Sequence, residues 1–326
     1  MPDRADQLFK PPFYLRNSMV QTWLASSPVR LAAGNPLSRC SQEVIVRAGE
    51  GVHLSGFLTR ADGDAPRGLA VLIHGWEGSA DAPYMVFTGS ALVRAGFDVF
   101  RLNLRDHGGN HQLNSGIFMG TLIDETFGAV RNVAEEYNRS DSLYLLGVSL
   151  GGNFALRIAA LCGKDMIDGL KQVVAVNPPL NPCDATVRLD RNPMIRRHFL
   201  GKWKASLRIK QKAFPHIYDF SHIEGADNCM DLTEDLIPRH SDCTSAADYF
   251  SRYTLKEGIL DRAAVPVTVI TAEDDPIIHA EDFRRAKVNG NVRLIMLPYG
   301  GHCGYIENLS MRSWLDRKVP ELFLAD

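Results

Sequence analysis

Ser149, in the stretch GVSLGG, is the residue whose surroundings most favour nucleophilic chemistry. Its frame is G-x-S-x-G; the apolar run 142–147 precedes it, and a run that can be helical, 153–163, follows it. A tight strand-to-helix turn of this kind pushes its central side chain out above the sheet and needs small residues where the two backbones pass. Gly147 and Gly151 meet that need. We therefore predict that Ser149 is a nucleophile beside a helix N-terminus, where free N–H groups favour developing negative charge.

A serine hydroxyl needs a base to take its proton, and a carboxylate to hold that base. The candidate base is His302, which follows the last predicted strand in a loop rich in glycine, PYGGHCGY. The acid lies in ITAEDDPII, where Asp274 and Asp275 compete. We favour Asp275 because it stands immediately before the proline turn. Asp274 would then be a turn or helix-capping residue, and Glu273 a solvated neighbour.

Acyl transfer also needs hydrogen-bond donors for the oxyanion of the tetrahedral intermediate. The loop HGWEGS, residues 74–79, follows a predicted buried strand and is placed to supply one. The backbone N–H groups of Trp76 and Leu150 are the natural pair, one after the H-G turn and one after the nucleophile. His74 could be mistaken for a base, but we expect it to orient this loop through hydrogen bonds.

The elements that must position these residues alternate along the chain. An early hairpin is predicted over 43–60, with its turn around Gly49 and Gly51, and the apolar run 69–75 is typical of a fully buried parallel strand. Further strands are predicted at 98–105, 142–147, 172–179, 265–276 and 291–302, and helices at 85–96, 121–138 and 153–161. Repeated strand–helix–strand units indicate an α/β protein with a mostly parallel sheet covered by helices on both faces.

A long segment between Pro179 and Pro266 breaks this rhythm, because it lacks clear buried strands. Most connections in compact domains are short, so we predict an inserted helical element above the carboxyl ends of the strands, where a lid would sit. The chain is accordingly divided into an irregular N-terminal arm (1–40), an α/β core (41–179 and 263–326) and a helical cap (180–262).

Basic residues gather at the start of this cap, while Ile195, Phe199, Trp203 and Leu207 recur every four residues. The basic set is Arg188, Arg191, Arg196, Arg197, Lys202, Lys204, Arg208, Lys210 and Lys212. This pattern predicts an amphipathic helix that lays its apolar stripe on the core and leaves its charges in solvent. The alternative is docking onto anionic lipid or an acidic substrate, which we expect to give at most a weak contact with a membrane surface.

Composition narrows the functional classes. The chain has 326 residues, 45% hydrophobic and 23% charged, with a formal net charge of -2, so we expect no nucleic-acid partner. Six scattered cysteines without a C-x-x-C pair indicate free thiols in a reducing compartment. The N-terminus mixes charge and proline and does not resemble a signal peptide. No segment reaches the roughly 18–20 apolar residues that span a bilayer, and we expect a cytoplasmic protein.

No cofactor or metal is predicted. The stretch NLRDHGGNH, residues 103–111, carries two histidines four apart, but Gly108 and Gly109 between them argue against a rigid helix that would hold both on one metal. We interpret it as a structural turn near the mouth of the site. GVSLGG reads G-x-x-x-G-G rather than G-x-G-x-x-G, so a dinucleotide site is not expected either.

The order Ser149, Asp275, His302, with HGWEG upstream, resembles the α/β-hydrolase superfamily. The N-terminal FKPPFYLRNSMVQTWLAS, together with HGWEGS, NLRDHGGN and AEDDP, is similar to the YheT-like branch of esterases, the AB-hydrolase 4 family. The resemblance runs from about Phe9 to Trp314 and is weakest over 180–262. It implies an α/β-hydrolase fold with an eight-stranded sheet and a helical cap, hydrolysis of carboxylic esters through an acyl-enzyme, and Asp275 as the acid.

We therefore expect a serine hydrolase (a lipase-like esterase) that cleaves a small-molecule ester, with an acyl chain as one candidate feature of that substrate. Ser149, Asp275 and His302 would form its catalytic triad, with no cofactor. Two alternatives stay open: acyl transfer or thioester cleavage by the same triad, and a non-catalytic ligand-binding protein of the same fold.

Overall fold

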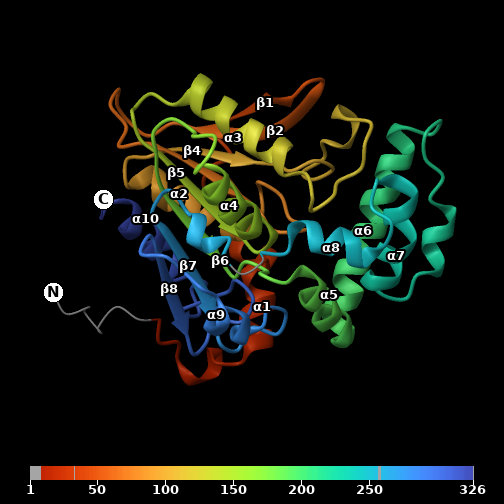
Figure 1. The fold of residues 1–326 in the computed structure, drawn as a ribbon. Coiled ribbons are helices and arrows are strands. Elements are labelled where there is room, and N and C mark those ends of the chain that lie inside the picture. The colour runs from red at the N-terminus through yellow and green to blue at the C-terminus, as the bar shows by residue number, and fades with distance from the viewer. Residues whose placement is uncertain (1–8, 33, 256–257, 326) are drawn as a thin grey trace.

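One mixed sheet forms the centre of the computed structural model, which describes residues 9–32, 34–255 and 258–325 (Figure 1). Its eight strands run in the order β1-β2-β4-β3-β5-β6-β7-β8, and the pairs on both sides of β2 are antiparallel while all others are parallel. The strands are β1 (Ser41–Gly49), β2 (Val52–Thr59), β3 (Leu69–Ile73), β4 (Asp98–Leu102), β5 (Leu143–Val148), β6 (Leu170–Val176), β7 (Val267–Ala272) and β8 (Val292–Leu297). The expected mostly parallel, eight-stranded sheet is confirmed.

Helices cover both faces of the sheet, which explains why the central strands are apolar along their whole length. They are α2 (Pro83–Arg94), α3 (Ile123–Tyr137), α4 (Leu150–Leu161), α9 (Ala280–Arg285) and α10 (Leu315–Phe323). Residues of α3 and α4 pack with Val71 and Leu145 in one core cluster. Residues of α2 and α10 pack with Leu72 and Leu146 in another, and alternate residues along a strand point to opposite faces.

The helical insert lies between β6 and β7 and projects to the right of the sheet in Figure 1. It contains α5 (Pro182–Arg191), α6 (Pro193–Ala213), α7 (Cys229–His240) and α8 (Ala246–Tyr253). The basic stretch is two helices rather than one, because Asn192 ends α5 and caps α6 by accepting hydrogen bonds from Met194 N and Ile195 N. Pro193 then takes the first helical position, where its missing N–H costs nothing.

The prediction that all basic side chains of this helix lie in solvent is wrong for Lys210. Its side chain is 1% exposed, and its Nζ donates to Asp106 Oδ1 at 2.8 Å and to the carbonyls of His111 and Asn114 at 3.1 and 2.6 Å. The pKa of Lys210 is lowered by burial, against the opposing charge of Asp106. A buried ammonium with this many acceptors ties the C-terminal half of α6 to the loop after β4.

The N-terminal arm is also more regular than predicted. Asn17 accepts hydrogen bonds from Met19 N and Val20 N and so caps an eight-residue helix, α1 (Ser18–Ala25). The buried side chain of Gln21 then reaches the far end of the chain: its Nε2 donates to Ile306 O, and its Oε1 accepts from Ile306 N at 2.7 Å. The arm is thereby fastened to the segment that carries His302.

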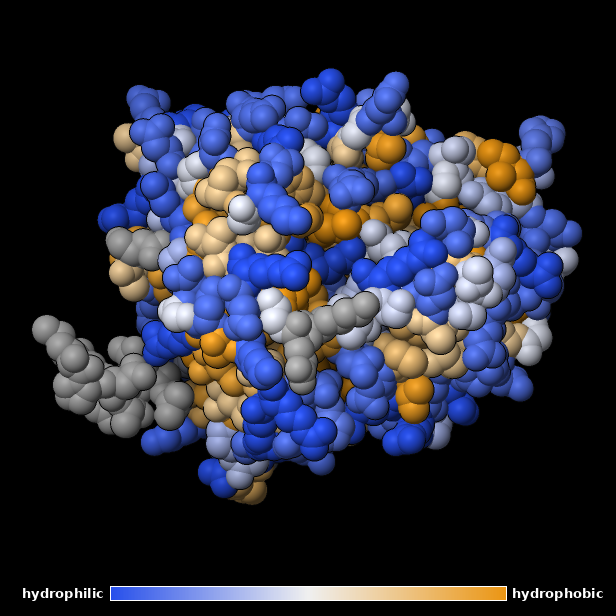
Figure 2. Space-filling view, viewed as in Figure 1, coloured by the Kyte–Doolittle hydropathy of each residue, from blue (hydrophilic) through white to orange (hydrophobic). Residues whose placement is uncertain are grey.

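The outer surface on the face shown in Figure 2 is mostly hydrophilic, with hydrophobic residues in separate groups. No helix among the described ranges combines the length and apolar character that crossing a bilayer requires.

We predict that Lys210→Met lowers the free energy of unfolding by about 3–5 kcal/mol, because it leaves the Asp106 carboxylate buried without its cation. Urea unfolding followed by circular dichroism measures this. The matched control, Lys212→Met, removes an exposed lysine two residues away and should change stability by less than about 0.5 kcal/mol. Equal stability of Lys210→Met and the wild type would refute the role of this contact.

Candidate active site

Ser149 stands in a strained turn between β5 and α4. Its backbone has φ 52° and ψ -120°, in the region that non-glycine residues rarely adopt. The flanking glycines are required by contact: a Cβ on Gly147 would lie 2.1 Å from Gly151 O, and one on Gly151 would lie 2.2 Å from Ile73 O. The local sequence thus folds into the sharp turn that its spacing predicted.

His302 connects Ser149 to Asp275. Its Nε2 lies 2.8 Å from Ser149 Oγ, and its Nδ1 lies 2.8 Å from Asp275 Oδ2. Because the carboxylate accepts, Nδ1 carries the proton and Nε2 is left to accept from the serine hydroxyl. The structure therefore brings together, at the carboxyl end of the sheet, the three side chains that the sequence placed far apart.

Asp275 is the carboxylate that contacts His302, and its four acceptor positions are filled. Oδ1 accepts from Ile277 N and Ile278 N at 2.8 and 3.0 Å, while Oδ2 accepts from Asn177 Nδ2 at 2.6 Å and from His302 Nδ1. These four hydrogen bonds fix the orientation of the carboxylate. The neighbouring Asp274 lies in a turn, one of its two predicted roles, and its Oδ1 accepts from Gly301 N at 2.9 Å, so it supports the histidine loop.

The electrostatics of the site favour the serine as nucleophile. Burial of the His302 ring lowers its pKa, but the adjoining Asp275 carboxylate and Cys303 sulfur together raise it, and the pKa lies above the usual value for histidine. That shift strengthens the ring as a proton acceptor for Ser149. Burial raises the pKa of the neighbouring Cys303 thiol, against the influence of His302, so this cysteine is held in its unreactive thiol form.

Several residues that position the triad were not predicted from the sequence. Thr22 Oγ1, on α1, accepts from His302 N at 2.9 Å. Asn177, with φ 44°, directs its amide at Asp275, and its Oδ1 accepts from Tyr305 OH at 2.7 Å. The one local sequence signal for the role of Asn177 is its place in VNPP, at the end of a predicted strand, because asparagine tolerates the left-handed region. The contact between Thr22 and His302 spans 280 residues, so no local sequence pattern indicates it.

The loop after β3 is held by two buried histidines. His74 Nε2 accepts from Leu104 N at 3.1 Å, so its Nδ1 carries the proton and donates to Gly75 O at 2.7 Å. His107 Nε2 in turn accepts from Glu77 N at 3.1 Å. His74 therefore orients this loop, as the sequence predicted.

The backbone of the same loop lies against the nucleophile. A Cβ on Gly75 would be 3.1 Å from Ser149 Cβ, and Gly78 N donates to Gly75 O at 3.0 Å to close a turn in which Trp76 is the second residue. Leu150 is the first residue of α4, where N–H groups lack a partner within the helix. Both predicted oxyanion donors are thus in elements that adjoin Ser149; their role stays a prediction.

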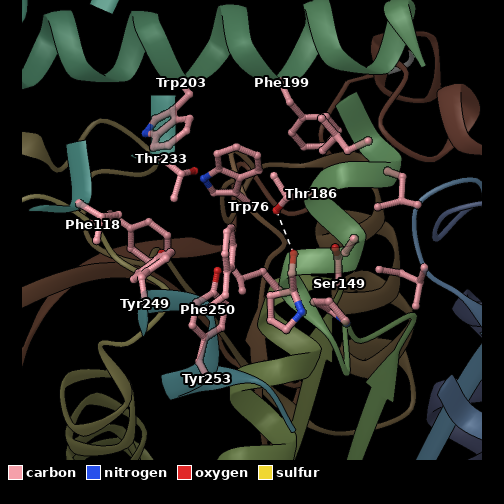
Figure 3. Close-up of a pocket in the computed structure, with 18 of the residues that line it drawn as sticks. Trp76, Phe118, Ser149, Thr186, Phe199, Trp203, Thr233, Tyr249, Phe250 and Tyr253 are labelled. Atoms are coloured by element: carbon pink, nitrogen blue, oxygen red, sulfur yellow. Dashed lines mark hydrogen bonds between the residues drawn. The ribbon is translucent and has the colours of Figure 1, made fainter. Parts of the chain in front are cut away.

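An apolar cavity with an open volume of about 890 Å³ reaches Ser149 and His302 (Figure 3). The insert supplies much of its wall, including Leu236 of α7 and Phe250 and Tyr253 of α8. Phe199 and Trp203 of α6 lie above Trp76 in Figure 3, with the Trp76 and Phe199 rings stacked 5.5 Å apart. The predicted apolar stripe of α6 therefore lines the cavity as well as packing on the core.

Nothing in the described ranges resembles a metal site. No group of three or more His, Cys, Asp or Glu side chains converges there. The two histidines of 103–111 make separate contacts, His107 with the loop after β3 and His111 Nε2 with Ser206 Oγ at 2.9 Å. The six cysteines are free thiols.

Comparison with known proteins agrees with this architecture. The model of the alpha/beta hydrolase family matches residues 70–309. An abhydrolase domain-containing protein of Dictyostelium discoideum is 23% identical over 96% of this chain and 80% of its own. Human phospholipase ABHD3 is 21% identical over 79% of this chain and 64% of its own, so this chain matches under two thirds of that protein.

A solved structure shares the fold. The Pyrococcus furiosus esterase Pf2001 superimposes with a TM-score of 0.56 at 18% identity, covering 87% of this chain and 92% of that one. At this identity the likeness shows the α/β-hydrolase fold with its helical insert, and no more.

We predict that acid weakens the folded state through His74. Burial, against a smaller opposing effect of the Gly75 carbonyl, lowers the pKa of His74 to about 4. Below the unfolded pKa of about 6.5 the unfolded chain binds a proton that the folded chain excludes. Stability is therefore lost as the pH falls from about 6.5 toward 4, with about 2 kcal/mol lost through this residue by about pH 5.

Urea unfolding at about pH 8 and about pH 5 measures the effect. His74→Gln should reduce the difference between the two pH values by about 2 kcal/mol, whereas His53→Gln, which changes an exposed histidine, should not alter it. An unchanged pH dependence in His74→Gln would show that this ring is not buried in its neutral form.

Proposed function

The chain belongs to the alpha/beta hydrolase family, and from the geometry of its site we propose that it is a serine hydrolase of carboxylic esters. The observation that carries the proposal is the unbroken series of hydrogen bonds from Asp275 through His302 to Ser149. Distant relatives described as phospholipases and esterases support the same reaction class.

In the proposed reaction, His302 Nε2 takes the proton of the Ser149 hydroxyl as its oxygen attacks the ester carbonyl. The carbonyl π electrons move onto oxygen, and the backbone N–H groups of Trp76 and Leu150 stabilise that oxyanion. When the oxyanion collapses, the ester C–O bond breaks and the alcohol leaves with the proton from His302. Water then attacks the acyl-serine by the same route, releases the acid and restores the hydroxyl.

Asp275 makes this proton transfer effective. Its carboxylate fixes the Nδ1–H tautomer and stabilises the imidazolium that forms while Nε2 holds the proton. Its other hydrogen bonds, from Asn177 and from the backbone of Ile277 and Ile278, prevent it from turning away. We infer no cofactor, because every step uses groups of this chain.

We infer that the apolar cavity binds the acyl chain of a small-molecule ester. Its wall is almost wholly aromatic and aliphatic, which suits a hydrocarbon. Access to lipid would come from a weak contact of α6 with a membrane surface. Exposed Met194 and Ile209, 64% and 49% accessible, accompany the exposed cations Arg197 and Lys212 on that helix.

We also infer that the chain belongs to the YheT-like branch, in which the arm (1–40), core and cap (180–262) form one functional unit. The support is that Thr22 and Gln21 of α1 accept hydrogen bonds from the backbone of His302 and Ile306. The N-terminal stretch that resembles this branch therefore positions the loop that carries His302.

We predict that Ser149→Ala abolishes labelling by a fluorophosphonate probe and reduces kcat/KM for p-nitrophenyl esters by about 10⁴-fold or more, because the nucleophile is lost. Gel fluorescence and initial rates measure the two effects, and circular dichroism confirms that the variant folds. Ser206→Ala, which removes a hydroxyl of α6 outside the triad, should still be labelled. Failure of the folded wild type to label would favour a non-catalytic binding protein instead.

We predict that acyl-chain preference follows the apolar cavity. Among p-nitrophenyl esters of increasing length, Leu236→Trp should shift the optimum toward shorter chains, because it fills space at the cavity wall. Rates for the shortest ester should change by less than about threefold. A uniform loss for all chain lengths would indicate that the acyl chain binds elsewhere.

A further inference from the structure

The two proposed oxyanion donors differ in how their direction is fixed. The N–H of Leu150 is directed by α4, because Leu150 is the first residue of that helix. Trp76 lies in the loop after β3, beyond Ile73, the last residue of that strand to pair with its neighbours. Within the described ranges no group accepts a hydrogen bond from Trp76 N, so this N–H is available to a substrate oxygen but is not held by a partner of its own.

The direction of Trp76 N–H follows from the carbonyl of Gly75, because the two belong to one planar trans peptide and point opposite ways. Gly75 O accepts from His74 Nδ1 at 2.7 Å and from Gly78 N at 3.0 Å. Rotation about the backbone bonds of Gly75 would still turn this peptide against the one before it. Glycine restricts that rotation least of all residues, so the N–H end of Gly75 needs a fixed contact as well.

The hydroxyl of Tyr84 supplies that contact. Its oxygen accepts from Gly75 N at 3.1 Å. Tyr84 is the second residue of α2, directly after Pro83, and its ring packs against the core cluster to which α2 and α10 contribute. A Cβ on Gly78 would lie 2.7 Å from the hydroxyl oxygen, so the glycine there leaves the room that the hydroxyl takes. The hydroxyl is therefore carried by a rigid ring on a helix and reaches the loop at one defined point.

Tyr84 belongs to the surroundings of the nucleophile. It lines a second cavity, with an open volume of about 1590 Å³, together with Gly75, Trp76, Ser149 and His302. A Cβ on Gly75 would lie 3.6 Å from Ser149 Oγ, so the backbone that Tyr84 contacts adjoins the reacting oxygen. Burial raises the pKa of Tyr84 above the usual value for tyrosine. The hydroxyl therefore stays neutral and adds no negative charge beside a developing oxyanion.

We propose that Tyr84 is a positioning residue for the oxyanion: by accepting from Gly75 N, its hydroxyl fixes the backbone of Gly75 and so directs the N–H of Trp76 at the oxyanion. The proposal rests on the proposed function, in which Trp76 N–H is one of the two donors. Tyr84→Phe removes the hydroxyl and keeps the ring, so it isolates this contact.

Steady-state kinetics of Tyr84→Phe with p-nitrophenyl esters test the proposal. Loss of an oxyanion donor costs about 10²–10³-fold in kcat, and a donor that is present but less well directed should cost about tenfold. KM should change by less than about twofold, because the oxyanion is absent from the bound substrate. The matched control is Tyr218→Phe in the insert, which removes a hydroxyl that donates to Ser115 O at 2.8 Å and lies outside both cavities. It should keep the wild-type kcat.

A pair of ketones separates the tetrahedral state from the ground state. 1,1,1-Trifluoro-2-octanone adds a serine oxygen to its carbonyl carbon and then carries the oxyanion, whereas 2-octanone stays trigonal. In Tyr84→Phe the inhibition constant of the trifluoromethyl ketone should rise about tenfold, and that of 2-octanone by less than about twofold. The wild-type kcat in Tyr84→Phe, an equal weakening of both ketones, or an equal fall of kcat in Tyr218→Phe would overturn the proposal.

Hydrogen–deuterium exchange tests the contact without turnover. The peptide that contains residues 74–79 should exchange about tenfold faster in Tyr84→Phe and unchanged in Tyr218→Phe, because one hydrogen bond to Gly75 N–H is lost. Unchanged exchange in Tyr84→Phe would refute the proposal whether or not the chain is a hydrolase. Faster exchange together with a folded wild type that neither hydrolyses esters nor reacts with a fluorophosphonate would instead refute the proposed function, and with it the assignment of this loop to an oxyanion.

Discussion

The imidazole of His302 must do two things at once, and the rest of the structure serves that constraint. It donates from Nδ1 to Asp275 and accepts at Nε2 from Ser149, each across 2.8 Å. The three residues follow different strands, β5, β7 and β8, which a parallel sheet brings to one edge because the carboxyl ends of its strands coincide. A change in register of one strand would break the series of hydrogen bonds.

Strain concentrates where this alignment is made. Positive φ values occur at four non-glycine residues around the triad: Ser149, Asn177, Cys303 and Tyr305. This conformation raises the free energy of the folded backbone and persists only where surrounding contacts fix it. The contacts come from distant parts of the chain: Thr22 on the arm meets the backbone of His302, and Tyr305 holds Asn177 against the acid. The N-terminal arm therefore supports the chemistry of a loop near the other end of the sequence.

Patterns within short stretches of the sequence predicted the features that depend on neighbouring residues, such as the strands and the turn at Ser149. The strands lie within a few residues of their predicted bounds, because each is a buried apolar run between turn residues, and Ser149 stood out because only glycines fit beside it. The helix in the arm was missed because its apolar face is short and its partner lies nearly 300 residues away. The basic stretch predicts a solvated Lys210, because helical periodicity does not show that one of its cations contacts a buried aspartate.

The central claim is that Ser149, activated by His302, carries the acyl group during turnover. The most direct measurement is rapid acid quenching of the enzyme during hydrolysis of a slow ester, followed by peptide mass spectrometry. The account predicts an acyl group on the peptide that contains Ser149, at a lower level in Asp275→Asn. Acylation of Cys303, whose thiol lies beside the same histidine, or steady hydrolysis with no acylated peptide at any time, would contradict it.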